Sequence, residues 1–125
     1  MPSLNLEWFL PFFQGALFCL LAMALHEGGH IVAALALGVK VKNVGFCWKG
    51  MYLVREAGPP AKNALVSLAG PLANVVLMLF WIWSPIFGLA NLCCGLANLL
   101  PIRGSDGDRI LTCLGEMREE RPVAQ

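Results

Sequence analysis

This sequence has few charged residues. Only 14% of its 125 residues are Asp, Glu, Lys or Arg, whereas 58% are hydrophobic. Soluble domains carry about a quarter charged residues, and a short chain cannot bury this much apolar surface by itself. The formal charge of +1 gives no indication of a nucleic-acid partner. The composition argues against an ordinary soluble domain and predicts a protein that lies in a lipid bilayer.

Cysteine is also too sparse and too irregular to organise the fold. The five cysteines are an odd number and are scattered along the chain. Neither their number nor their spacing predicts a disulfide framework or a cysteine zinc site. No internal repeat, low-complexity segment or motif for an organic cofactor is evident, and we treat residues 1–125 as one domain.

What the chain has instead is three long apolar runs. A membrane-spanning helix needs about 20 residues, and the first run, Trp8 to Leu37, exceeds that length. The sequence predicts a mostly α, polytopic membrane protein of the cell membrane. Its three transmembrane helices are expected at about residues 9–37, 62–83 and 85–101. A cleaved signal peptide is the alternative for the first run, but the opening residues MPSLNLEW contain no Lys or Arg.

The basic residues predict how the helices are oriented. Of the nine Lys and Arg, five lie between the first and second predicted spans and four follow the third. Basic loops stay on the cytoplasmic side. The N-terminus is therefore expected outside and the C-terminus in the cytoplasm. In the first basic segment, two runs of β-favouring residues flank Lys49-Gly50, which predicts a small cytoplasmic β-hairpin at about 39–56.

The only two histidines lie inside the first apolar run, in the motif HEGGH at residues 26–30. Residues four apart share one helix face, so His26 and His30 can bind one metal ion. In an H-E-x-x-H motif the glutamate, here Glu27, acts as general base beside a zinc ion. The alternative is that hydrogen bonds inside the helix bundle satisfy both histidines, but burying three polar side chains without a metal is costly.

A catalytic zinc ion needs a third protein ligand. Asp106 is the acidic residue that follows the third predicted span most closely. Ser105 and Asp108 together fit the start of a short polar helix, with Ser105 as its N-cap. Capping by Ser105 leaves the Asp106 side chain free, so Asp106 is our candidate.

Two asparagines within the predicted spans have two interpretations. Asn74 and Asn98 recur at helical spacing with small residues, as expected for seams where helices pack closely in lipid. Each could equally bind substrate backbone or stabilise an oxyanion. The sequence leaves both interpretations open.

Three stretches together resemble one known family. HEGGH at 26–30, SLAGPLAN at 67–74 and NLLPIRGSDG at 98–107 are similar to the signature stretches of the site-2 protease family of intramembrane zinc metalloproteases. The resemblance implies Zn²⁺ held by His26, His30 and Asp106, with Glu27 as the catalytic acid. It also implies hydrolysis of peptide bonds in or near transmembrane segments of membrane-tethered proteins.

The chain departs from that family in what it lacks. Within these 125 residues we expect neither a peptide-binding domain of the PDZ type nor a regulatory domain, so the sequence resembles a minimal core of the family. A membrane protein that binds or transports zinc without proteolysis is the alternative function, and a silent helical scaffold is another. The expected partners are a membrane-tethered protein substrate and the lipid bilayer, and a second copy of the chain is left open.

Overall fold

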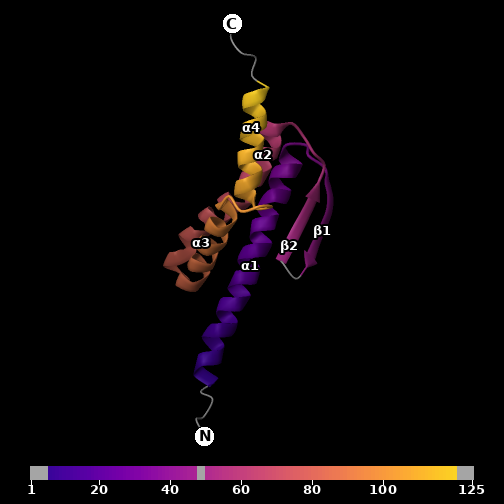
Figure 1. Ribbon diagram of the computed structural model, residues 1–125. Helices are drawn as coiled ribbons and strands as arrows, with labels where there is room; N and C mark the ends of the chain where they lie inside the picture. The colour runs from indigo at the N-terminus through magenta and orange to yellow at the C-terminus, as the bar shows by residue number, and fades with distance from the viewer. Residues whose placement is uncertain (1–5, 48–49, 121–125) are drawn as a thin grey trace.

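A computed structural model of the protein describes residues 6–47 and 50–120. The described chain is mostly helical with one small antiparallel sheet, which confirms that part of the predicted fold (Figure 1). The elements are α1 (Leu6–Ala36), β1 (Val41–Cys47), β2 (Gly50–Arg55), α2 (Pro60–Met78), the 3₁₀ helix η1 (Leu79–Ile82), α3 (Pro85–Leu99) and α4 (Asp106–Glu119).

Proline and glycine set the helix boundaries. Pro60 and Pro85 are the first residues of α2 and α3, where a missing N–H costs nothing. After α1, Gly38 adopts a φ of 71°, which favours glycine. The next residue, Val39, donates its backbone N–H to the carbonyl of Ala34 at 2.8 Å and so closes the helix end.

Two helical segments are long and apolar enough to cross a membrane, judged by length and composition. They are Glu7–Ala36, with 30 residues, and Pro60–Ile82, with 23 residues. The third predicted span corresponds to α3, which has 15 residues and is about 22 Å long. This is shorter than a hydrocarbon core of about 30 Å, and the third span stays a prediction.

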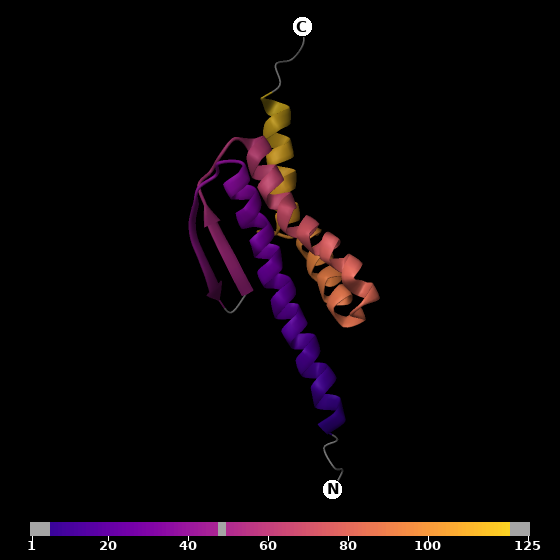
Figure 2. The ribbon, with the colours of Figure 1, turned by 180° about the vertical axis from the view of Figure 1, so that it is seen from behind.

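Helix α1 is the longest helix of the described chain. It packs against α2 and α3, while its N-terminal half extends beyond them (Figure 2). Gly29 lies where α1 and α2 approach closely, and an added Cβ there would be 2.7 Å from the carbonyl oxygen of Ala69. Without a side chain at this position, the HEGGH turn of α1 can lie directly on α2.

The predicted β-hairpin is present and folds back along α1. Its strands pair antiparallel, with Val44 opposite Leu53 and an irregularity between Val41 and Asn43. Of the predicted turn residues, Lys49 lies outside the described residues. Strand β2 lies between α1 and β1, so the free edge of β2 is the one that faces α1 (Figure 1).

Helix α4 begins as its sequence predicts. Ser105 is the N-cap, and its Oγ accepts a hydrogen bond from the backbone N–H of Asp108 at 3.2 Å. The Asp108 carboxylate accepts in turn from the N–H of Gly104 at 3.0 Å. Gly107 fits against the carbonyl of Leu99 at the end of α3, where an added Cβ would overlap that oxygen. This docking brings Asp106 back to the helix bundle.

Candidate metal centre

Two histidine side chains of α1 meet a carboxylate from the start of α4, which is distant in the sequence. The Nε2 atom of His26 lies 3.1 Å from Nε2 of His30 and 2.8 Å from Oδ2 of Asp106. The third side of this triangle, from His30 Nε2 to Asp106 Oδ2, is 3.2 Å. All three residues are buried. The structure therefore brings together the three ligands that the motif and the resemblance suggest.

The triangle has the size that a zinc ion requires. Zinc binds histidine nitrogen and carboxylate oxygen at about 2.0–2.2 Å in a tetrahedron, so its ligand atoms are about 3.3 Å apart. The three atoms need to move by only a few tenths of an ångström to share one ion. Two imidazoles and one carboxylate also form a ligand set of catalytic zinc sites, which leaves a fourth position for water or substrate.

The other nitrogen of each imidazole is held by the protein. His26 Nδ1 donates to the side-chain oxygen of Asn74 at 2.6 Å, and His30 Nδ1 donates to the carbonyl of Val66 at 2.6 Å. Both partners are acceptors. The Val66 partner is a carbonyl oxygen, and Asn74 must present its oxygen to His26 because its amide nitrogen donates to the carbonyl of Ala22. With Nδ1 protonated in both rings, the Nε2 lone pairs face the shared position, as in histidines that bind metals.

Gly70 of α2 lies directly against the imidazoles of His26 and His30. A Cβ at this position would overlap the Nε2 of His30 and lie 2.8 Å from the Nε2 of His26. The two imidazoles converge only because this residue has no side chain. The AGP turn of α2 is thus shaped to accept the histidines of α1.

Asp106 remains ionised despite its burial. Burial alone would raise the pKa of this carboxyl group, but its close contacts with the imidazoles of His26 and His30 outweigh burial and hold the pKa well below its usual range. An ionised carboxylate is the form that a zinc ion needs as a ligand.

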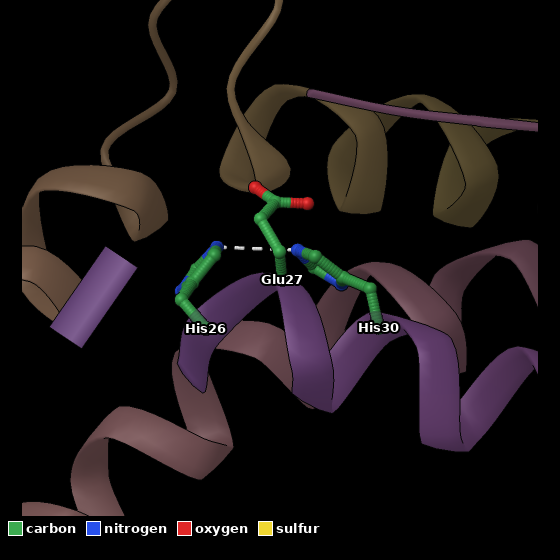
Figure 3. A group of neighbouring side chains, drawn as sticks. All are labelled: His26, Glu27 and His30. Atoms are coloured by element: carbon green, nitrogen blue, oxygen red, sulfur yellow. Dashed lines mark hydrogen bonds between the residues drawn. The ribbon is translucent and has the colours of Figure 1, made fainter. Parts of the chain in front are cut away.

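Glu27 stands beside the centre. Figure 3 shows it between His26 and His30, with its carboxylate directed away from α1. One carboxylate oxygen of Glu27 and one ring nitrogen of each histidine lie within 4.8 Å of one another. Glu27 also lines two cavities, a mostly polar one of about 190 Å³ and a more apolar one of about 410 Å³ between α1 and α3. It can therefore contact both the metal position and a molecule that enters from either cavity.

The two asparagines lie in different surroundings. Asn74 is fully buried, and its amide contacts His26, Ala22 and Asn91. Asn98 lines both cavities beside Glu27 and donates to the carbonyl of Cys94 at 2.8 Å. In these contacts Asn74 orients a ligand, whereas Asn98 faces space that a substrate can occupy.

Three contributors to the centre were not predicted from the sequence. Gly70 carried a signal, since it lies in the stretch that resembles the family, but its role required knowing which helix faces the histidines. The role of the Val66 carbonyl has no signal in the sequence, because every residue has a backbone carbonyl. Arg55, at the end of β2, lines the polar cavity and had no motif around it.

The comparison with known families agrees with this centre. The Peptidase M50B-like family profile matches residues 5–102, most of the chain. The chain belongs to this metallopeptidase family. The match confirms the resemblance to the site-2 protease family and covers both histidines, Glu27 and both asparagines, while Asp106 lies just beyond its end.

One curated relative gives the same indication. The chain is 32% identical over 112 residues to "Putative zinc metalloprotease sll0528" from Synechocystis sp.. The alignment covers 77% of this chain and 30% of the relative. The chain therefore spans less than a third of the length of this relative.

Proposed function

We propose that this chain is the catalytic core of an intramembrane zinc metalloendopeptidase. Its substrates would be membrane-tethered proteins, cut in or near their transmembrane segments. The observation that carries the proposal is the triangle of His26, His30 and Asp106 at zinc-ligand spacing, with Glu27 beside it. Family membership supports the metallopeptidase class.

The membrane position is part of the same proposal. The two longest helical segments are apolar enough to span a bilayer, and their outer faces expose large side chains such as Phe12, Leu35 and Val76. Lipid is the environment in which such a surface is stable. We place the protein in the cell membrane as a multi-pass protein, with α3 as a short third span, the N-terminus outside and the C-terminus in the cytoplasm.

Each side chain has a definite task in peptide hydrolysis. When bound, the zinc ion would polarise the scissile carbonyl and lower the pKa of a bound water toward 7. Glu27 accepts the proton of the attacking water and delivers it to the leaving amine. Asn98 faces the same cavities and is placed to donate to a developing oxyanion. Asn74 keeps His26 in the required tautomer.

A substrate must be extended where it is cut, because a helix occupies its own carbonyl groups. The free edge of β2 beside α1 is a suitable template for an added strand. Tyr52 and Leu53 of β2 line the polar cavity with Glu27, so the strand reaches the centre. Peptides with N-methyl groups at alternate residues next to the scissile bond test this pairing. Unchanged cleavage of the methylated peptides would exclude it.

Zinc content and cleavage together test the proposed function. The protein and a Glu27→Gln variant are purified, bound zinc is measured, and each is incubated with a model transmembrane peptide. A peptidase predicts zinc in both proteins and cleavage only by the unmodified one. Zinc without cleavage in either would favour a zinc-binding protein or transporter. Zinc in neither would favour a scaffold.

One observation already weighs against the transporter. An ion path needs several groups of ligands in succession. In residues 6–47 and 50–120, the group around His26 is the only cluster of three or more His, Cys, Asp or Glu side chains suited to a metal ion.

A further inference from the structure

Two arginines from different elements border the metal centre. Arg55 ends β2 and Arg109 lies in the first turns of α4. Both line the polar cavity of about 190 Å³ that also contains Glu27, His30 and Asp106. Both also line the adjoining cavity of about 450 Å³ between β2, α2 and α4. The two arginines therefore border both the metal centre and the cavity next to it.

Arg55 is held in a fixed position without being neutralised. Its guanidinium donates to the hydroxyl of Ser67 at 2.7 Å and to the carbonyl of Asn63 at 3.4 Å. Ser67 is fully buried, which anchors the half-buried arginine against α2. Burial, and then the like charge of Arg109, lower the pKa of Arg55 from its usual value. The group remains a cation, since arginine does not lose its proton in proteins.

Neither arginine has an acidic partner in the described part of the chain. Every carboxylate contact within 4.0 Å of a basic group there joins Asp106 to a histidine. Asp108 and Glu56 line only the outer cavity, and the Asp108 carboxylate caps α4 through Gly104. Two neighbouring cations without a counter-ion repel one another, and such a pair is stable mainly when an anion joins it.

The charges of the centre itself do not supply that anion. Glu27 and Asp106 contribute two negative charges, which a zinc ion would balance. The two guanidinium groups then leave the cavity with a net positive charge. A substrate residue that carries a carboxylate is the complement of this site, because guanidinium groups bind carboxylates through paired hydrogen bonds.

We propose that Arg55 and Arg109 form a substrate-specificity site that binds an acidic side chain of the peptide near its scissile bond. The proposal rests on the proposed peptidase function. In an extended peptide each residue advances about 3.3 Å, so a side chain that reaches the arginines from the centre belongs to a residue within about three positions of the cut.

Binding tests this site separately from catalysis. Each of six model transmembrane peptides carries a single Glu, at one of the three positions on either side of the scissile bond. A matched set of six carries Gln at the same positions. Their affinity is measured for the zinc-loaded Glu27→Gln variant. We expect one position at which Glu binds about tenfold more tightly than Gln, as one charge-assisted hydrogen bond would give. Equal affinity at every position would overturn the proposal, even if no peptide were cleaved by any form of the protein.

Substitutions then assign the effect to the arginines. Arg109→Gln, at an exposed position, should abolish the preference for Glu, and so should Arg55→Gln. Arg103→Gln is the matched control, because Arg103 is exposed at the same end of the protein and lines neither cavity. In the cleavage assay, Arg109→Glu should favour a Lys peptide over its Glu counterpart. An unchanged preference in Arg109→Gln, or its loss in Arg103→Gln, would refute the site.

Discussion

The Nδ1 atom of His26 lies 2.6 Å from the side-chain oxygen of Asn74, although 48 residues separate them in the sequence. This contact fixes both the orientation and the tautomer of a metal ligand. Asn74 also bridges to Asn91 of α3 at 2.9 Å, so one buried amide connects three helices at the level of the metal centre. Helix packing and ligand geometry are therefore coupled at this point.

That coupling makes Asn74 a measurable positioning residue. Asn74→Ala removes the acceptor of His26 Nδ1, and the zinc affinity should fall about 10- to 100-fold, as for other partners of metal ligands. The measurement is a zinc titration against a competing chelator. Asn63→Ala is the control, because Asn63 belongs to the same helix but its side chain bonds to Gly58, away from the histidines. Equal losses of affinity in both variants would show a general packing defect instead.

Gly70 and Gly28 provide a paired test of the space around the ligands. Gly70→Ala places a methyl group against the Nε2 atoms of both histidines, and we expect it to lose zinc and peptidase activity. An added Cβ at Gly28 meets nothing within 4 Å, although this residue lies inside the HEGGH motif. Gly28→Ala should bind zinc normally and gain about 0.5–1 kcal/mol of stability from reduced backbone freedom. The checks are metal content and thermal unfolding in detergent.

Local signals made the helices and the α4 cap predictable. The apolar runs predicted where α1, α2 and α3 lie to within a few residues. The cap at Ser105 followed from side-chain chemistry within four residues. These features depend on neighbours in the sequence, so the sequence alone contains them.

Contacts between elements were not predictable in the same way. The spacing of His26 and His30 shows that they share a face of α1, but it does not show that Gly70 and Val66 of α2 lie opposite them. Alternation predicts the β-hairpin but not that β2 borders α1, which is what brings Arg55 to the centre. The two interpretations of Asn74 stayed open for the same reason, because the rotation of α2 decides which residue its amide meets.

Asp106 and Asp108 separate ligand chemistry from helix capping. Both lie in the first turn of α4, but only Asp106 reaches the histidines. Asp106→Asn replaces a carboxylate ligand with a neutral amide, and we expect zinc affinity to fall by at least tenfold and cleavage to be lost. Asp108→Asn keeps an oxygen that can accept from Gly104 and loses only the negative charge in the first turn, so it should cost about 0.3–1 kcal/mol of stability and keep its zinc. A zinc-bound, active Asp106→Asn variant would remove Asp106 from the ligand set.

Removal of the metal should affect stability as well as activity, because the three ligands come from α1 and α4, the two ends of the described chain. Any ligand that binds only the folded state stabilises it, by about 4 kcal/mol when its concentration is 1,000 times the dissociation constant. We therefore expect a chelator to lower the unfolding temperature and stop cleavage, and added Zn²⁺ to restore both. Mg²⁺ should restore neither, because it prefers oxygen ligands to imidazole. The Asp106→Asn variant is the control, and its unfolding temperature should respond much less to zinc. A zinc response as large in that variant as in the unmodified protein would place the stabilising ion elsewhere in the chain.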